Sequence, residues 1–293
     1  MKFSGKISVV MPAYNEAAFI TSNVHETVAT LTGLNYDFEV IVVDDGSTDQ
    51  THLAAAQVLS AHAHRVRVVR YDRNEGKGNA LICGSGYASG DLIAFLDADM
   101  DLHPSQLARF FEILEASGAD AVIGSKWHKE SRVSYPVLRK VYSLTYFTFV
   151  RLLFGLPVRD TQTGLKLFRA NALKSTLPYL LAKRFAFDVE LLANMHRRGY
   201  KIVSAPVTLS FKRTLGRIRI KHVWRTFLDT LAIFYRMHLI HYYDRPLVPS
   251  KQQRSRLIQF ATAEEGGIAH LQGPNSSSDP LLGEPKFVSQ DRG

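Results

Sequence analysis

The sequence contains a single cysteine, Cys83, among its 293 residues. One thiol forms no internal disulfide and cannot supply the paired cysteines of a CxxC zinc or redox site. Glycine and proline, with 19 and 11 residues, are close to average abundance, which excludes a collagen-like or low-complexity chain. No internal repeat is evident. The composition that remains, 46% hydrophobic and 22% charged, is that of a soluble protein long enough to bury a sizeable core.

Long uninterrupted apolar runs are also missing. The charged start Met1–Lys6 leads into only five or six apolar residues, so we expect no signal peptide. The two most apolar stretches, 135–156 and 222–243, are interrupted by charged residues: Arg139, Lys140 and Arg151 in the first, and Arg225, Asp229 and Arg236 in the second. A spanning helix needs about 20 mostly apolar residues. We therefore expect no transmembrane helix, but two segments apolar enough to lie on a bilayer.

Positive charge is scarce in the first part of the chain and abundant in the second. Residues 1–120 hold 8 Lys or Arg against 16 Asp or Glu, a net charge of −8. Residues 121–245 hold 23 against 6, a net charge of +17, and residues 246–293 hold 5 of each sign. The basic part predicts anionic partners: nucleotide phosphates, anionic lipid or nucleic acid.

Short β-branched runs alternate with helical stretches through the first 125 residues. The predicted strands are Ile7–Met11, Phe38–Val43, Val66–Arg70, Leu92–Leu96 and Ala121–Ile123. The predicted helices between them cover 16–31, 50–61, 77–89 and 104–117. This alternation indicates βαβ units and an α/β fold with a mainly parallel sheet flanked by helices.

The pattern changes after residue 124. We expect basic, aromatic helices at 135–154 and 219–243, a helix at 187–198, and strands at 163–168 and within 201–210. From 246 the sequence is rich in Ser, Gln and Gly without periodicity, and we expect a mostly disordered tail. The predicted organisation is a nucleotide-binding half at 1–124, an acceptor- and membrane-facing half of the same domain at 125–245, and the tail at 246–293.

Acidic or polar clusters follow three of the predicted strands. They are Pro12–Glu16, Asp44–Asp49 and Asp97–Asp101. In an open parallel sheet, ligands bind beyond the carboxyl ends of the strands, so these clusters are expected around one crevice. Gathered carboxylates repel one another and favour a cation, and hard oxygen ligands select Mg²⁺ or Mn²⁺. Such a metal usually takes its remaining ligands from water and substrate phosphates.

Each cluster taken alone has a plainer explanation. Asp-Asp-Gly-Ser is often only a turn and helix cap. Gly76-Lys77-Gly78 lacks the GxxxxGK[ST] pattern of a phosphate loop and reads better as a helix start flanked by glycines. No convincing Ser-His-Asp set appears, and the eleven histidines show no metal-ligand spacing. The order and spacing of the clusters together carry far more information than any one of them.

In that order and spacing the motifs resemble family 2 glycosyltransferases of the GT-A fold. They are Val10–Glu16, Val42–Asp49, Gly76–Gly78 and Leu96–Asp99. Two later blocks, Arg159–Phe168 and Phe185–Leu192, resemble the polyprenyl-phosphate hexosyltransferases, with dolichyl-phosphate glucosyltransferases nearest and mannosyltransferases similar. The resemblance covers about residues 6–243.

The resemblance implies roles for individual residues. A nucleotide-sugar site would be lined by Pro12, Tyr14, Glu16, Val42, Asp44, Asp45, Lys77, Asp97, Ala98, Asp99, Lys126, Arg213 and Arg219. Catalysis would depend on Asp97, Asp99 and Arg213, and the metal would be held by Asp97, Asp99 and Asp101. The acceptor phosphate would be met by Lys126, Arg139 and Lys140. The chain departs from the family at Lys126, commonly Arg, at Asp101, often Gln in mannosyltransferases, and at Ile218, usually Ser.

The implied activity is inverting, Mg²⁺- or Mn²⁺-dependent transfer of a hexose from a nucleoside diphosphate sugar to polyprenyl or dolichyl phosphate. UDP-glucose is the favoured donor; GDP-mannose, UDP-N-acetylglucosamine and a soluble glycan acceptor are the enzymatic alternatives, and a catalytically dead nucleotide-binding or membrane-scaffold protein is the non-enzymatic one. We expect a peripheral or monotopic position on the cytoplasmic face of a membrane, with an anionic membrane surface as partner. A membrane subunit or a second copy of the chain remains open as a partner. Nucleic acid is not expected, since the acidic crevice opposes a long polyanion.

Overall fold

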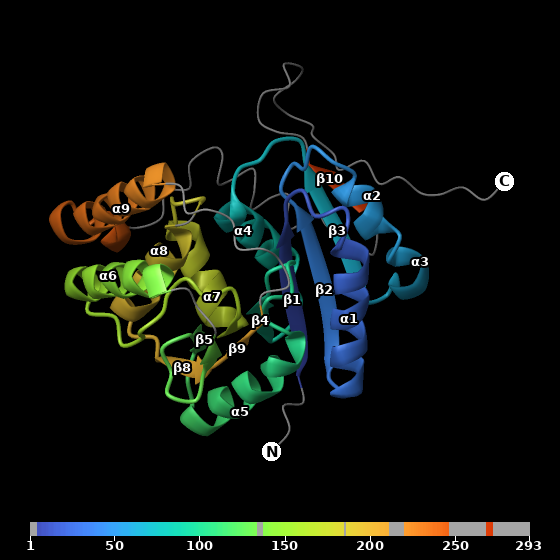
Figure 1. Ribbon diagram of the computed structural model, residues 1–293, viewed down its shortest axis with the longest axis horizontal. Helices are drawn as coiled ribbons and strands as arrows, with labels where there is room; N and C mark the ends of the chain where they lie inside the picture. Colours follow the sequence, from blue (N-terminus) through green and yellow to red (C-terminus); the bar gives the residue numbers. More distant parts are fainter. Residues whose placement is uncertain (1–4, 134–136, 185, 211–219, 246–267, 272–293) are drawn as a thin grey trace. The chain divides into compact units, whose positions relative to one another are not determined.

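The computed structural model describes residues 5–133, 137–184, 186–210, 220–245 and 268–271. The chain forms two compact units (Figure 1). What we call the first unit comprises Ser4–Asp99 and Val248–Gly293, and the second unit comprises Met1–Phe3 and Met100–Leu247. Each is described by itself below.

The first unit is a parallel sheet with helices packed on it. Its strands are β1 (Lys6–Ala13), β2 (Asp37–Asp44), β3 (Val66–Tyr71), β4 (Leu92–Phe95) and β10 (Ile268–Leu271), in the order β10-β3-β2-β1-β4. All four pairings are parallel. Its helices are α1 (Ile20–Gly33), α2 (Thr51–Ala56), α3 (Leu59–His62) and α4 (Lys77–Tyr87).

Strands β2 and β4 of the first unit are buried on both faces over most of their length. In β2, every residue from Val40 to Val43 is fully buried, as its continuous apolar sequence predicts. The helix predicted at 50–61 is interrupted after Ala56. Val58, which is fully buried, donates its N–H to the Ala55 carbonyl three residues back, which tightens the chain there and starts α3 in a new direction.

Strand β10 lies within the stretch for which no structure was expected. It pairs in parallel with β3, with Ile268 opposite Val68 and Leu271 opposite Tyr71. An edge strand presents unpaired N–H and C=O groups that a further strand satisfies. The four residues of β10 are too few to show periodicity, which is why the sequence did not indicate them. The remainder of the predicted tail lies outside the described residues.

The second unit combines a small mixed group of strands with helices. Its strands are β5 (Ala121–Ser125), β6 (Arg132–Val133), β7 (Lys166–Arg169), β8 (Ile202–Pro206) and β9 (Thr208–Leu209). Its helices are η1 (Pro104–Gln106), α5 (Leu107–Ser117), α6 (Val137–Phe154), α7 (Ala170–Thr176), η2 (Leu177–Tyr179), α8 (Phe187–Arg197), α9 (Ile220–Phe234), η3 (Tyr235–Leu239) and η4 (Tyr242–Asp244). Strand β5 pairs antiparallel with β7 and parallel with β8, and β6 pairs with β9.

Helix α8 supplies much of the second unit's core. Its apolar face, made of Phe187, Leu191, Leu192 and Met195, is at most 1% exposed. Helices α6 and α9 pack against each other through Phe149, which stacks on Phe227 with ring centroids 3.9 Å apart. The predicted α/β class, mainly parallel strands flanked by helices, is confirmed.

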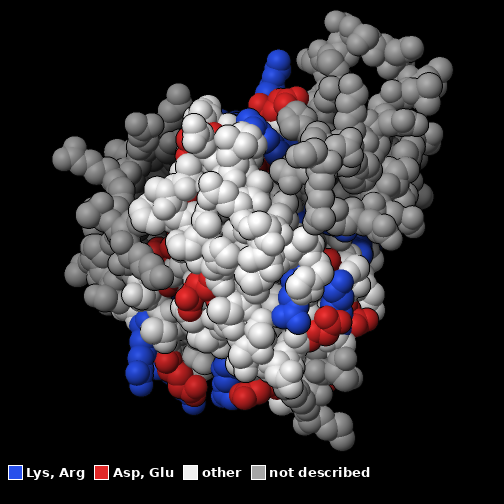
Figure 2. Space-filling model, turned by 90° about the vertical axis from the view of Figure 1, so that its right-hand side faces the viewer, with Lys and Arg blue, Asp and Glu red and all other residues white. Residues whose placement is uncertain are grey.

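Neither basic, aromatic helix has the length and apolarity that crossing a bilayer requires, and the same holds for every other helix in the described part of the chain. Figure 2 views the side on which α2 and α3 lie. Helices α1, α2 and α3 contain one charged residue, Glu26. Much of the visible described surface is accordingly uncharged, and charges of both signs gather along its lower edge.

Candidate functional site

The polar loops after β1, β2 and β4 leave the sheet of the first unit at one edge. Strand β1 lies between β2 and β4, and all three are parallel. Their register places Ala13 opposite Asp44 and Val10 opposite Phe95. The sequence predicted that 12–16, 44–49 and 97–101 gather around one crevice. Of these, 12–16, 44–49 and 97–99 follow neighbouring strands at one edge of the sheet, and residues 100 and 101 belong to the second unit.

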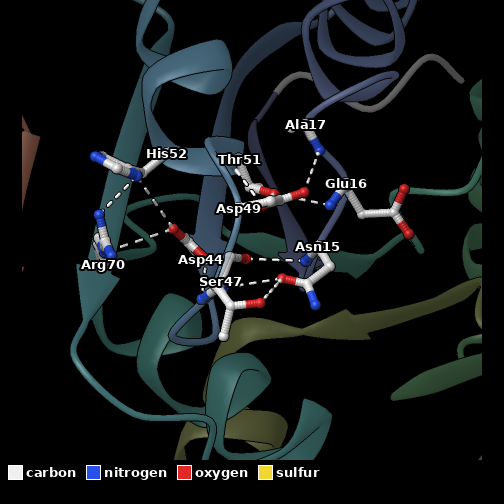
Figure 3. Close-up of polar contacts among 10 residues, drawn as sticks. Asn15, Glu16, Ala17, Asp44, Ser47, Asp49, Thr51, His52 and Arg70 are labelled. Carbon is white, nitrogen blue, oxygen red and sulfur yellow. Dashed lines mark hydrogen bonds and ion pairs between the residues drawn. The ribbon is translucent and has the colours of Figure 1, made fainter.

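Backbone-to-side-chain hydrogen bonds lock the loop after β1 to the loop after β2 (Figure 3). The Asn15 N–H donates to Ser47 Oγ over 2.9 Å, and Asn15 Oδ1 accepts from the Thr48 N–H over 2.9 Å. The Glu16 N–H donates to Thr51 Oγ1 over 2.7 Å. Because these amides are bonded across the loops, the predicted helix start at residue 16 is delayed and α1 begins at Ile20.

The predicted nucleotide-pocket residues of β1 and β2 differ in accessibility. Tyr14 is 43% exposed, while Pro12 and Glu16 are half-buried. The Glu16 carboxylate points away from the loop after β2 (Figure 3). The Val42 side chain is fully buried in the sheet. Tyr14 and Glu16 are thus the side chains of this group best placed to meet a ligand.

Asp44 ends β2 and is fully buried beside a cation. Its Oδ1 accepts a hydrogen bond from the Ser47 N–H over 2.9 Å. Its Oδ2 lies 3.7 Å from Arg70 Nε and 4.0 Å from His52 Nδ1, and Arg70 Nη1 lies 2.6 Å from the same His52 nitrogen (Figure 3). Asp44 Oδ2 and Arg70 Nε are both buried without a hydrogen-bond partner among the described residues. A buried carboxylate oxygen in this state is ready to accept an N–H from a ligand.

Asp45, the next residue, anchors the turn that starts α4. Its Oδ1 accepts from the Tyr71 hydroxyl over 2.8 Å and from the Glu75 N–H over 2.9 Å, and Oδ2 accepts from the Gly76 N–H over 3.0 Å. Burial raises the pKa of Asp45, and these bonds counteract part of that rise. Gly76 has φ 105°, which a residue with a Cβ adopts only under strain, so this turn requires glycine.

The turn held by Asp45 brings Lys77 to the Asp-x-Asp sequence after β4. Lys77 Nζ lies 2.5 Å from Asp97 Oδ1, and both side chains are about one-third exposed. The carbonyl of Ala98 accepts from Asn23 Nδ2 over 2.7 Å, which fixes the backbone between the two aspartates. Asp99 is half-buried. Among the described residues no three His, Cys, Asp or Glu side chains are grouped closely enough to hold a metal ion by themselves.

Lys126 lies in the second unit and is engaged in a nearly closed ion pair. Its Nζ lies 2.8 Å from Asp160 Oδ2 and 3.0 Å from Thr163 Oγ1. Burial alone would raise the pKa of Asp160, but the ammonium of Lys126 and the bonds from Lys126 and Thr163 outweigh it, so the pKa of Asp160 is lowered. The charge of Lys126 is largely compensated inside the protein.

Two further buried ion pairs lie around α8. Lys166 Nζ is 2.7 Å from Asp188 Oδ1, with both side chains less than a tenth exposed. Glu190, fully buried, meets Arg236 Nη2 at 3.2 Å and accepts a short hydrogen bond from the Tyr243 hydroxyl. We expected Arg236 to border a bilayer-facing helix. It points inward instead, because Glu190 lies within reach of its long side chain.

The remaining predicted site residues divide into three groups. Arg213 and Arg219 lie outside the described residues. Arg139 and Lys140 belong to α6, and only the backbone of that part of the helix is described. Asp101, half-buried, belongs to the second unit, where its carbonyl accepts from the Ser210 N–H over 3.0 Å.

Sequence reasoning missed Arg70 and His52, which surround Asp44. Arg70 is the second of two arginines in β3 and lies near its carboxyl end, and a cation at the carboxyl end of a strand next to β2 was a usable signal. His52 gave no signal, since it begins a short helix among neutral residues. The part played by Asp45 also had no signature that distinguished it from Asp44.

The sequence and the structure are both similar to those of known glycosyltransferases. The sequence pattern described as glycosyl transferase family 2 matches residues 8–177. Glycosyltransferase AglD of Haloferax volcanii is 34% identical over 204 residues, which are 69% of this chain and 32% of that protein. Dolichyl-phosphate beta-glucosyltransferase ALG5C of Trichomonas vaginalis is 31% identical, over 68% of this chain and 62% of that protein. Polyprenol monophosphomannose synthase of Mycolicibacterium smegmatis is 30% identical, over 71% and 78%.

The chain thus spans about a third of AglD and less than two-thirds of ALG5C. Among solved structures, glucosyl-3-phosphoglycerate synthase of Mycobacterium tuberculosis, in complex with Mn²⁺, uridine diphosphate and phosphoglyceric acid, superimposes with a TM-score of 0.60 at 23% identity. This likeness covers 83% of this chain and 80% of that one and shows that the fold is GT-A. The family pattern covers more than half of the sequence, so the chain belongs to glycosyl transferase family 2.

Proposed function

We propose that this chain is a metal-dependent, inverting hexosyltransferase that moves one hexose from a nucleoside diphosphate sugar to polyprenyl or dolichyl phosphate. UDP-glucose is the favoured donor. Relatives named dolichyl-phosphate beta-glucosyltransferase from Trichomonas vaginalis, Dictyostelium discoideum and Saccharomyces cerevisiae, at 28–31% identity, support glucose as the sugar and dolichyl phosphate as the acceptor class. The mannose-specific relative supports the acceptor class with a different sugar.

The proposal rests above all on one observation in the first unit. The same sheet edge carries a buried carboxylate that has one oxygen without a hydrogen bond, Asp44, and a carboxylate about one-third exposed, Asp97, that pairs with the ammonium of Lys77. A nucleotide needs an acceptor for an N–H of its base or for a ribose hydroxyl, and it needs a cation beside its phosphates. A cation held by Asp97 would meet the second need. Asp44 would take the first part, with Arg70 and His52 holding it in place.

The carboxylates of Asp97 and Asp99 fit a Mg²⁺ or Mn²⁺ ion. They are hard oxygen donors, and the ammonium of Lys77 against Asp97 supports a cation at this position. The two carboxylates suffice, because such ions commonly take their other ligands from water and substrate phosphates. A bound ion would neutralise the leaving diphosphate. Arg213 and Arg219 are proposed, on the family resemblance, to add positive charge at the same phosphates.

The acceptor explains why no strong general base is required. A lipid monophosphate is anionic at pH 7, so its oxygen attacks the anomeric carbon directly while the diphosphate leaves from the opposite face, which inverts the configuration. The residues only need to hold the two phosphates apart and in line. Because Lys126 is compensated by Asp160, we assign more of the acceptor's charge neutralisation to Arg139 and Lys140 of α6.

Helix α9 and the η3 helix that follows it carry the membrane-facing part of the proposal. Trp224, Leu228, Leu231, Tyr235 and Leu239 are between 39% and 64% exposed, at spacings of four, three, four and four residues. That spacing places them on one face of a helix, and an aromatic-aliphatic stripe of this kind suits an interfacial helix on a lipid surface. Not every aromatic residue serves this purpose, since Phe149 and Phe227 pack α6 against α9.

A donor screen tests the proposed function. UDP-glucose, GDP-mannose and UDP-N-acetylglucosamine, each radiolabelled in the sugar, are incubated with the protein, Mn²⁺ or Mg²⁺, and a polyprenyl phosphate. Label from UDP-glucose moving into the organic phase, dependent on metal and absent with the Asp99→Ala variant, is the expected result. An α-linked donor should give a β-linked product, which glycosidase sensitivity of the lipid product establishes.

Other outcomes separate the alternatives. Organic-phase label from GDP-mannose alone would keep the acceptor class and replace the donor. Label that stays in the aqueous phase on an added glycan or phosphorylated small molecule would replace the acceptor. Transfer that proceeds unchanged in EDTA would contradict the metal dependence.

A further inference from the structure

We propose that Lys77 is a resident counterion of Asp97 that gives up this carboxylate when a divalent cation arrives and then pairs with the diphosphate of the donor. The inference rests on the proposed function, and it adds an exchange of partners at the site. It assigns one lysine two successive roles, first pairing with Asp97 before the metal binds and then pairing with the donor phosphates.

The position of Lys77 is set by the fold rather than by chance contact. Asp45 holds the N–H groups of Glu75 and Gly76, and α4 begins at the next residue. The backbone of Lys77 is thereby fixed, while its four-carbon stem lets the ammonium move over several ångströms. Asp97 is fixed in turn by the backbone that follows β4, where the Leu96 N–H donates to the Val10 carbonyl.

The ion pair is close but weakly held. Lys77 Nζ lies 2.5 Å from Asp97 Oδ1, and the two side chains are 32% and 29% exposed. Water screens a pair with this exposure, and such pairs add little stability. The buried pair Lys166–Asp188, at 2.7 Å with 2% and 7% exposure, shows the contrasting case of a permanent pair in the same chain. The Lys77–Asp97 pair is therefore suited to exchange.

A divalent cation and the ammonium compete for the same carboxylate. Mg²⁺ approaches carboxylate oxygen to about 2.0–2.1 Å, closer than the ammonium, and the two positive charges repel each other. The lysine is displaced as the ion binds. Lys77 begins α4, where the helix dipole favours negative charge nearby, so a donor diphosphate at this helix start offers the displaced ammonium a new anionic partner.

The exchange predicts effects of opposite sign in one variant. In Lys77→Met the competitor is gone, so Mn²⁺ alone should bind about three- to tenfold more tightly. The same variant lacks a charge-assisted contact to phosphate, so UDP in the presence of saturating Mn²⁺ should bind about tenfold more weakly. Lys77→Arg keeps a cation and should stay within about threefold of wild type in both measurements. A lysine that only supports the helix start would not shift the two affinities in opposite directions.

Mn²⁺ titration of the full chain, followed by the electron paramagnetic resonance signal of free Mn²⁺, measures the first affinity, and calorimetric titration with UDP measures the second. Lys6→Met is the matched control, since Lys6 also pairs with a carboxylate, Glu39 at 3.6 Å, at the other end of β1; it should leave both affinities unchanged. Opposite shifts in Lys77→Met support the exchange. Wild-type Mn²⁺ affinity in that variant, or weakening of both ligands together, overturns it. No Mn²⁺ binding by the wild type, with or without UDP, overturns the proposed metal-dependent function as well.

Discussion

The two units surround their buried carboxylates with different partners. In the first unit, Asp44 and Asp45 receive backbone N–H groups and a tyrosine hydroxyl, and the nearest cation to Asp44, Arg70, lies 3.7 Å away without a hydrogen bond. In the second unit, Asp160 and Asp188 each hold a lysine ammonium within 2.8 Å. The neutral donors around Asp44 leave one of its oxygens able to accept a ligand. A lysine ammonium compensates the charge of Asp160 and of Asp188 instead.

The difference changes the meaning of the charge counts. Residues 121–245 carry a net charge of +17, but Lys126, Lys166 and Arg236 form ion pairs with buried carboxylates of the same unit. The charge that an anionic partner meets is carried by other residues, such as the exposed Arg225 of α9. The −8 segment, by contrast, keeps half-exposed carboxylates at a sheet edge. For the acidic segment, the net charge correctly indicates carboxylates that can meet a cation. For the basic segment, the net charge overstates the positive charge that an anionic partner can meet.

The largest expected effect tests whether the partly exposed carboxylates at the sheet edge of the first unit take part in the transfer reaction. Asp99→Ala should lower the transfer rate by on the order of 10³-fold, because a metal ligand facing the leaving diphosphate is lost. Thermal unfolding should shift by no more than about 2 °C, since the side chain is half-buried and at a loop. Glu112→Ala, at an exposed carboxylate of α5, is the control and should retain wild-type turnover. Near-normal transfer by Asp99→Ala would remove Asp99 from the site.

Removing one cation from each unit tests the comparison directly. Lys166→Met leaves Asp188 charged and buried, which should cost about 3–5 kcal/mol of unfolding free energy. Arg70→Met should cost only about 1 kcal/mol, because the hydrogen bond to Asp44 comes from the Ser47 N–H and remains. Urea unfolding followed by tryptophan fluorescence and circular dichroism measures both. Equal losses would mean that Asp44 depends on its cation as fully as Asp188 does.

The third test is the dependence of the unfolding free energy on pH in the acid range. The pKa of Asp160 is lowered in the folded chain, so its ionised form stabilises the fold above the ordinary value of 3.8, and that contribution is lost as pH falls through the lower, folded-state pKa. Asp160→Asn should lower the unfolding free energy by about 3 kcal/mol at pH 7, since Lys126 is left with little compensation. Between pH 5 and pH 3 its stability should fall less steeply than that of the wild type. A parallel decline in both proteins would show that Asp160 contributes little to acid unfolding.

Particular residues show which parts of this structure the sequence could predict. The strands and the shared edge of their polar loops follow from apolar runs, turn residues and parallel order, all of which are local or topological. The pairing of Lys126 with Asp160 joins residues 34 positions apart, and no local pattern encodes it. Arg225 and Arg236 are eleven residues apart, which places them on the same side of a regular helix, yet one is exposed and the other turns inward. What separates them is Glu190, a tertiary partner that periodicity does not reveal.

The same limit applies at the site. Asp44 and Asp45 are adjacent and chemically identical, so only the fold shows that one accepts from the Ser47 N–H with an oxygen to spare while the other is consumed by the turn before α4. The sequence allowed two interpretations of Asp-Asp-Gly-Ser, a turn and part of a ligand site. The turn is confirmed at Asp45. The ligand site stays a prediction, and Asp44 is the residue of the motif that has an oxygen left for it.

The smallest expected effect concerns the exposed apolar residues, which are also distributed unequally. The first unit exposes Tyr14, Phe19 and Leu53 on separate elements, whereas α9 and the η3 helix that follows it align five large residues on one face. Replacing Leu228 and Leu239 of that face by Ser should weaken partition onto anionic liposomes about tenfold, because two side chains lose part of their burial in the interface. Leu53→Ser, at 53% exposure on α2, is the matched control and should not alter partition. If both variants lost partition equally, liposome binding would depend on exposed apolar residues in general and not on this helix face. If the Leu228 and Leu239 variant partitioned like the wild type, the face would serve another partner.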